Sequence, residues 1–235
     1  MPFFSEPYVL LVAGSPKGIT EAHLEQLASN AGYVIAADSG ADLARSSKVS
    51  LDYIIGDLDS ISRDVLVFFQ DIDTEFITAD PHKDETDLEL ALDFIDRHGN
   101  LSSLPLVVTN VLGGRVDHEL ASLGVIARYH HLRPRIVEDD AVVFFLSSSF
   151  PELILTDRGV DIQEELGSVH QVDARHTIVS VIPLLGEAVV SETGLEWELD
   201  HACLLPLDTW GVSNCMKDSE ARVNVHEGIA AVFLY

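Results

Sequence analysis

The sequence predicts an α/β N-terminal domain with a mainly parallel sheet, followed by an all-β, sandwich-like C-terminal domain. Over roughly the first 145 residues, short continuous apolar runs alternate with amphipathic stretches, as expected for strands that helices cover on both faces. Beyond that point, Gly, Pro and Asp turns divide strand-like runs, and no long helical period is evident. We therefore expect one domain over residues 1–145 and a second over residues 146–235.

The first domain should begin with strands and helices in alternation. The apolar run at residues 8–13 (YVLLVA) predicts a strand, and residues 20–31 predict the helix that follows it. Residues 33–37 and 53–55 predict two further strands, and residues 104–112 predict a fourth. This order favours parallel strands joined by right-handed crossovers.

The clearest helix is predicted over residues 84–98, and Thr86 and its acidic neighbours suit its first turn. Gly99 and Asn100 should end it. A second helix is predicted from Asp117 to about His130. The apolar stripe of the first helix consists of Leu88, Ala91, Leu92 and Ile95.

In the second domain, residues 177–182 and 229–235 have the composition of strands. Turn residues separate these runs from their neighbours. A small sandwich is the simplest fold that buries one face of such strands.

The composition excludes several functions. The formal net charge of −25 gives a surface that repels nucleic acid and anionic lipid, so we expect neither as a partner. Cys203 and Cys215 have no spacing typical of zinc or redox sites. The N-terminus lacks a basic segment, and the run at residues 8–13 is too short to span a bilayer. These features predict a cytoplasmic protein.

Three acidic motifs directly follow or precede predicted elements. Asp38 begins the segment DSG after one strand, residues 56–60 (GDLDS) follow the next, and residues 82–87 (HKDETD) open the predicted helix. Ligands in open α/β sheets bind beyond the carboxyl ends of the strands, so we expect these motifs to share a crevice.

The spacing of the carboxylates suggests what they bind. Asp57 and Asp59 would point the same way from extended backbone, and Asp84 and Asp87 would share one face of a helix. Hard oxygen ligands without convergent His or Cys favour Mg²⁺ or Mn²⁺, held together with substrate phosphates. A single Asp-x-Asp is usually turn chemistry or solvated charge, but three clusters at strand ends favour a functional site.

A fourth motif, residues 113–118 (GGRVDH), closes the strand predicted at residues 104–112. Its glycines let the backbone approach a ligand, and Arg115 could bind phosphate oxygens with its planar guanidinium. A plain strand-to-helix turn with Asp117 as the N-cap fits this segment equally well. Residues 14–18 (GSPKG) lack the spacing of a Walker A loop.

In this order, the motifs resemble those of the thiamin pyrophosphokinase family. The resemblance extends into the second domain and spans roughly residues 33 to 215. The matching segments are residues 37–41, 55–60, 83–87, 113–118, 193–197 and 211–214.

The resemblance implies an α/β domain, a β-sandwich and a homodimer with active sites at the subunit interface. It implies that Mg²⁺ and the ATP phosphates are held by Asp57, Asp59, Asp84 and Asp87, with Asp38 close by. Lys83 and Arg115 would neutralise phosphate charge, and Asp117 would support the nucleotide site.

The same resemblance places thiamin in the second domain. Ser213 and Asn214 would contact its pyrimidine ring from the partner subunit. Trp197 or Trp210 could add an aromatic wall. An ordinary core position is at least as good an interpretation of Trp197.

The implied reaction is attack of the thiamin hydroxyl on the β-phosphorus of ATP, with release of AMP. Asp59 or Asp87 could accept the hydroxyl proton. The alternatives are a pyrophosphokinase for another hydroxymethyl heterocycle, a metal-dependent phosphohydrolase, and a non-catalytic nucleotide- or thiamin-binding protein.

Overall fold

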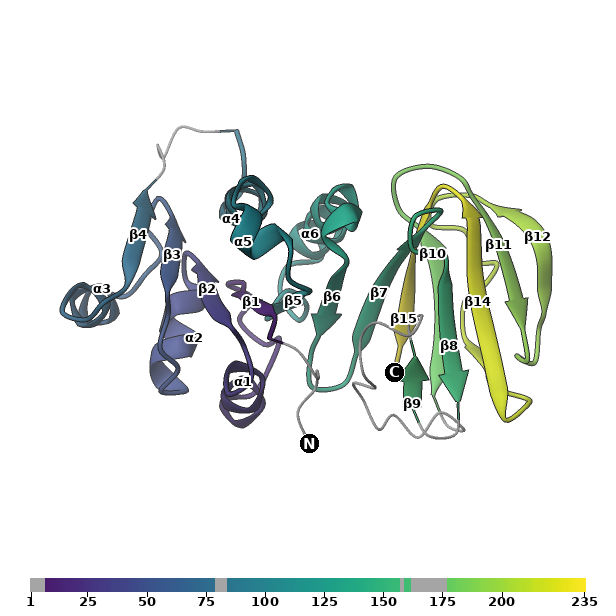
Figure 1. The fold of residues 1–235 in the computed structure, drawn as a ribbon, viewed down its shortest axis with the longest axis horizontal. Helices are drawn as coiled ribbons and strands as arrows, with labels where there is room; N and C mark the ends of the chain where they lie inside the picture. Colours follow the sequence, from purple (N-terminus) through teal and green to yellow (C-terminus); the bar gives the residue numbers. More distant parts are fainter. Residues whose placement is uncertain (1–6, 79–83, 157–158, 162–176) are drawn as a thin grey trace. The chain divides into compact units, whose positions relative to one another are not determined.

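The computed structural model describes residues 7–78, 84–156, 159–161 and 177–235 (Figure 1). Contacts between residues divide the chain into two compact units. The α/β unit comprises Pro7–Ile126 and Ile136–Asp139, and the β unit comprises Ala127–Arg135 and Asp140–Tyr235. The boundary predicted between residues 145 and 146 stays a prediction.

The part of the chain from residue 7 to residue 139 alternates strands with helices. Its strands are β1 (Val9–Val12), β2 (Tyr33–Ala37), β3 (Tyr53–Gly56), β4 (Glu75–Thr78), β5 (Leu106–Thr109) and β6 (Pro134–Val137). Its helices are α1 (Glu21–Ala28), α2 (Gly40–Ser46), α3 (Arg63–Gln70), α4 (Asp87–Arg97), α5 (Gly99–Ser102), α6 (Val116–Arg128) and the 3₁₀ helix η1 (His130–Leu132).

The sheet of the α/β unit has the strand order β6-β5-β1-β2-β3-β4. β1 is central and pairs in parallel with β2 and with β5, and all four of its residues are buried. Figure 1 shows α1, α2 and α3 on one face of the sheet and α4, α5 and α6 on the other. Covering on both faces explains why the inner strands are continuous apolar runs, and parallel pairing brings their carboxyl ends to one edge.

The β unit consists of antiparallel strands. They are β7 (Val142–Ser147), β8 (Glu152–Thr156), β9 (Gly159–Asp161), β10 (Ile178–Pro183), β11 (Ala188–Thr193), β12 (Leu199–Leu204), β13 (Asn214–Cys215), β14 (Glu220–Glu227) and β15 (Ile229–Leu234). One set has the order β13-β10-β15-β7 and the other β12-β11-β14-β8-β9. Alternate residues of β14, namely Ala221, Val223 and Val225, are buried, and β14 contacts β7, so the two sets pack as layers.

The fold class predicted from the sequence is confirmed. The strand predicted at residues 33–37 is β2 without change. α1 (Glu21–Ala28) lies within the helix predicted at residues 20–31 and is shorter. The strand predicted at residues 104–112 is longer than the observed strand β5 (Leu106–Thr109), because the residues after Thr109 leave the sheet to form a loop. The helix predicted at residues 84–98 begins only at Asp87. Among the described residues, none of the helices has the length and apolar character that crossing a membrane requires.

Candidate active site

A cavity of about 520 Å³ lies at the edge of the α/β unit where the carboxyl ends of the strands meet. The loops after β1, β2 and β5 contribute to its wall, together with the first turns of α4 and α6. This is the position at which open α/β sheets bind ligands. Polar residues of the wall include Ser15, Asp38, Ser39, Ser60, Thr86 and Asp87.

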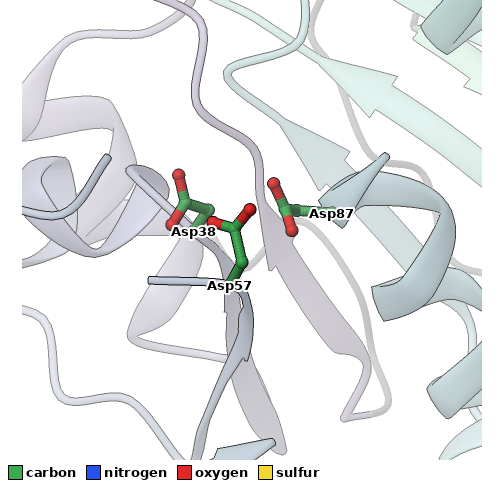
Figure 2. Close-up of side chains that lie close together, drawn as sticks. All are labelled: Asp38, Asp57 and Asp87. Carbon is green, nitrogen blue, oxygen red and sulfur yellow. The ribbon is translucent and has the colours of Figure 1, made fainter. Parts of the chain in front are cut away.

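Three carboxylates converge at this edge (Figure 2). One oxygen from each of Asp38, Asp57 and Asp87 lies within 4.8 Å of the other two. Asp38 follows β2, Asp57 follows β3, and Asp87 is the first residue of α4. Each of the three acidic motifs therefore contributes one carboxylate to a group that could hold a metal ion.

Asp38 is the most deeply buried member of the cluster. Its side chain is 6% exposed, and its Oδ1 atom has no hydrogen-bond partner among the described residues. Burial raises the pKa of Asp38, and the charges of Asp87 and then Asp57 raise it further. Several carboxylates so close together repel one another unless a proton or a cation lies between them.

Gly56 makes room for the cluster. A Cβ atom at this position would lie 2.9 Å from Oδ1 of Asp87 and 3.1 Å from Cβ of Asp38. Its φ of +152° is also one that side-chain-bearing residues rarely adopt. The glycine at the end of β3 therefore allows the carboxylates from β2 and α4 to approach.

Asp59 lies outside the cluster, and the extended geometry predicted for residues 57–59 is wrong. Leu58 has a φ of +67°, so the chain turns between the two aspartates. The Oδ1 atom of Asp57 accepts a hydrogen bond of 3.2 Å from the backbone N–H of Asp59, which is a local turn. The exposed carboxylate of Asp59 instead accepts a 2.9 Å bond from the Ser60 hydroxyl.

Asp84 also lies outside the cluster. The prediction that it shares a helix face with Asp87 is wrong, because α4 begins at Asp87. Thr86 is the N-cap of α4, and its Oγ1 accepts a 3.3 Å hydrogen bond from the N–H of Glu89. Asp84 precedes this cap and is exposed, whereas Lys83 lies outside the described residues.

Arg115 lines the cavity next to the start of α6. Its Nη2 and Nε atoms donate to the two carboxylate oxygens of Asp117 at 2.6 and 3.1 Å. This ion pair is exposed; it raises the pKa of Arg115 and lowers the pKa of Asp117. Because α6 begins at Val116, Asp117 belongs to its first turn and is not its N-cap.

Ser213 and Asn214 lie at the start of β13 in the β unit. Ser213 is exposed and has a φ of +60°. Asn214 is buried, and its amide nitrogen donates to Glu192 Oε2 at 2.9 Å and to the carbonyl of Trp197 at 2.7 Å. Its amide oxygen accepts from the N–H groups of Trp197 and Cys215 at 3.2 and 3.0 Å. These four bonds use the ordinary capacity of an amide side chain.

The two tryptophans are both surface residues. Trp197 is 64% exposed and Trp210 is 63% exposed, so the interpretation of Trp197 as a core residue is wrong. Ser39, Ser60 and His118 also line the cavity, and none of them is among the predicted site residues. Ser39 and Ser60 belong to the acidic motifs, and His118 belongs to residues 113–118, so their positions were available from those segments.

These features define a two-unit protein in which an open α/β sheet carries a carboxylate cluster beside a ligand cavity and an antiparallel β unit follows it. The family description "Thiamin pyrophosphokinase, catalytic domain" matches residues 24–137, and "Thiamin pyrophosphokinase, vitamin B1 binding domain" matches residues 166–230. The chain belongs to the thiamin pyrophosphokinase family.

Known proteins show the same similarity. Thiamine pyrophosphokinase 1 of Arabidopsis thaliana is 31% identical over 186 residues, which cover 77% of this chain and 64% of that protein. The chain thus spans less than two thirds of this relative's length. A thiamin pyrophosphokinase family protein from Enterococcus faecalis has a TM-score of 0.72 at 22% identity, covering 97% of this chain and 98% of that one. Thiamin pyrophosphokinase from Candida albicans has a TM-score of 0.75 at 15% identity, covering 97% and 88%. These two structures share the fold.

Proposed function

We propose that the protein transfers a pyrophosphoryl group from ATP to the hydroxyl of thiamin, giving thiamin diphosphate and AMP. The observation that carries this proposal is the cluster of Asp38, Asp57 and Asp87 beside the cavity of the α/β unit. The matches to a catalytic and a vitamin B1 binding domain support the choice of substrates.

The cluster fits Mg²⁺. Its donors are carboxylate oxygens, and the unpartnered Oδ1 of Asp38 is an acceptor suited to a cation. When bound, Mg²⁺ would neutralise negative charge on the phosphates of the nucleotide. We propose Asp38, Asp57 and Asp87 as the residues that hold it. Asp59 and Asp84 stay proposed as further catalytic carboxylates, which would contact Mg²⁺ once the substrates are bound.

We propose that the nucleotide occupies the cavity with its phosphates towards the cluster and Arg115. Arg115 would exchange part of its bond to Asp117 for phosphate oxygens, which its guanidinium can bind with two parallel N–H groups. Lys83, next to Asp84 in the sequence, is proposed as a second cation for the phosphates.

The proposed chemistry forms one bond and breaks another. The thiamin hydroxyl oxygen bonds to the β-phosphorus, the bond from that phosphorus to the α,β-bridging oxygen breaks, and AMP leaves with that oxygen. A carboxylate, Asp59 or Asp87, would take the hydroxyl proton. Alignment and charge neutralisation dominate such transfers, so a rigid cavity wall is the main contribution of this chain.

We propose Ser213 and the exposed Trp197 and Trp210 as the contacts for thiamin. Asn214 would act indirectly, by holding the backbone of Trp197, because its amide is already used within the β unit. We also propose that the protein is a homodimer with active sites at the subunit interface. We propose that it acts in the cytoplasm, where the reducing conditions would keep both cysteines free, as they are in the structure.

³¹P NMR of the purified protein with ATP, Mg²⁺ and thiamin tests the reaction. The expected products are AMP and thiamin diphosphate. Formation of ADP, hydrolysis of ATP without thiamin, or transfer only to another hydroxymethyl heterocycle would each contradict the proposal.

Light scattering coupled to size-exclusion chromatography measures the molar mass in solution and so tests the proposed homodimer.

A further inference from the structure

Two loops of the cavity wall are joined to each other by hydrogen bonds outside the regular strands and helices. They are residues 13–18 after β1 and residues 110–115 after β5. Asn110 joins them: its side-chain Nδ2 donates to the carbonyl of Ala13 at 2.7 Å, and its Oδ1 accepts from the N–H of Gly18 at 3.1 Å. The Asn110 carbonyl also accepts from the N–H of Ser15 at 2.9 Å. The conformation of Asn110 therefore sets the position of both loops.

A single buried carboxylate fixes that conformation. Glu138, which follows β6, is 2% exposed. Its Oε2 accepts a 3.0 Å hydrogen bond from the N–H of Asn110, and its Oε1 accepts bonds of 2.7 and 3.1 Å from the N–H groups of Val111 and Leu112. Asn110 has a left-handed φ of +59°, a conformation that Asn adopts more readily than most residues other than glycine, and these bonds hold it there.

The chemistry of the side chain matters as much as its shape. Both oxygens of Glu138 receive backbone N–H groups, and an ionised carboxylate accepts at both positions without carrying a donor of its own. An amide of the same size would turn its NH₂ group towards a backbone donor and leave that donor unsatisfied inside the protein. The loop that continues to Gly114 and Arg115 would then lose its anchor.

We propose that Glu138 is a positioning residue for the nucleotide: it holds residues 110–112, and so fixes where the following residues Gly114 and Arg115 line the cavity in which the phosphate groups would bind. This inference rests on the proposed nucleotide site in the cavity. Glu138 does not line the cavity itself, so it acts through the loop. Such an anchor adds to affinity by removing the cost of ordering the loop on binding.

The test compares Glu138→Gln with the wild type at about pH 8. Burial raises the pKa of the Glu138 carboxyl to about 7, although its bonds from backbone N–H groups lower it, so the carboxyl group is ionised at this pH. The dissociation constant of a non-hydrolysable ATP analogue with Mg²⁺, measured by calorimetry, should rise about tenfold, which corresponds to about 1.4 kcal/mol. The KM for ATP should rise in parallel, while the KM for thiamin changes less than about twofold.

Asp52→Asn is the matched control. The Asp52 carboxylate also accepts a backbone hydrogen bond, 2.7 Å from the N–H of Val34, but at the opposite, amino-terminal end of the strands. It should alter stability without altering nucleotide affinity. Glu138→Asp keeps a carboxylate on a shorter side chain, and its nucleotide affinity should lie closer to that of the wild type than the affinity of Glu138→Gln does.

Unchanged nucleotide affinity in Glu138→Gln would overturn the inference, and so would an equal rise of both KM values, which would indicate general loosening. If Glu138→Gln does not fold, Glu138→Asp decides, because its shorter side chain cannot keep all three backbone bonds. Weaker binding of the analogue with a nearly unchanged KM for thiamin supports the inference, whereas wild-type affinity for the analogue, or an equal loss for analogue and thiamin, overturns it. Absence of thiamin diphosphate formation by the wild type would refute the proposed function, whereas the calorimetric comparison would still test Glu138.

Discussion

At the scale of single residues, Asp38 is the most deeply buried carboxylate of the cluster. A buried carboxylate oxygen without a hydrogen-bond partner among the described residues is costly, and two further carboxylates increase the cost. Proteins retain such arrangements when a ligand offsets the repulsion. The proposed divalent cation would do so at Asp38, Asp57 and Asp87 together, and would then account for three separate segments placing carboxylates at one point.

Replacing Asp57 by Asn tests this explanation. The variant should stay folded but lose roughly 100-fold or more in turnover, because one anionic ligand of the cation is gone. Turnover should be followed across a range of Mg²⁺ concentrations, with the apparent affinity for Mg²⁺ also reduced. Asp64→Asn, an equivalent change at an exposed position of α3, is the control. Similar kinetics in the two variants would remove Asp57 from the site.

Gly56 allows a second test at this scale, through space rather than charge. In Gly56→Ala the new methyl group would meet Oδ1 of Asp87 at 2.9 Å, so the carboxylates must separate. We expect turnover to fall by about 100-fold, as misplacement of a catalytic group does, with a loss of stability of about 1–3 kcal/mol. At Gly99, in α5, a Cβ would meet nothing within 4 Å, so Gly99→Ala should leave turnover unchanged. Full activity of Gly56→Ala would show that the cluster tolerates rearrangement.

The sequence predicted which motifs meet, but not which carboxylate of each motif enters the cluster. The extended backbone predicted for residues 57–59 makes Asp57 and Asp59 point the same way, and the family resemblance names Asp59 rather than Asp38 as a metal ligand. The outcome depends on positive φ angles at Asp38 and Leu58, and Leu58 in particular gives no local signal for such a conformation. Glu138 had no signal either, because its role follows from three backbone contacts with a segment 26 to 28 residues away.

At the scale of elements, buried strands were the most predictable part of the fold. β1 and β2 are apolar because both faces of the sheet are covered, and this leaves an unmistakable run in the sequence. α2 has only seven residues, which is too few for a helical period to stand out in the sequence. β4, the last strand at its end of the sheet, has two exposed and two half-buried residues, so it lacks the apolar run of an inner strand.

The N-terminus of α4 is the element on which the position of Asp87 depends. The Thr86 hydroxyl oxygen accepts the N–H of Glu89, so Thr86→Ala removes the cap and should cost about 1 kcal/mol of stability. Because Asp87 is the next residue, we also expect reduced turnover. Urea unfolding and steady-state kinetics measure the two effects. Thr86→Ser keeps the hydroxyl and should restore both; a Ser variant as impaired as the Ala variant would refute the role of the cap.

At the scale of the whole molecule, the stability of the folded chain depends on a carboxyl group buried in the β unit. In the β unit, Glu192 is 0% exposed; its Oε2 accepts the amide of Asn214, and its Oε1 has no hydrogen-bond partner among the described residues. Burial raises the pKa of Glu192 to about 7, although the bond from Asn214 lowers it. The carboxyl group therefore makes the stability of the folded chain depend on pH.

The direction of that dependence follows from proton binding. The unfolded chain releases the Glu192 proton near its ordinary pKa of 4.5, whereas the folded chain keeps it until about pH 7. Between these values the folded state binds more protons, so the contribution of Glu192 to stability falls as pH rises through this window and stays low above it.

Glu192→Gln should abolish this dependence, because Gln keeps the acceptor for Asn214 and carries no charge. Relative to the wild type, the free energy of unfolding should be similar at about pH 5 and higher by about 1–3 kcal/mol at about pH 8. Trp197 and Trp210 both belong to the β unit, so their fluorescence during urea unfolding reports on the relevant part of the chain. Glu196→Gln, at an exposed position nearby, should show no such pH-dependent difference. A Glu192→Gln variant that is equally destabilised at both pH values would mean that the carboxylate is ionised and stabilised in the fold, contrary to the burial argument.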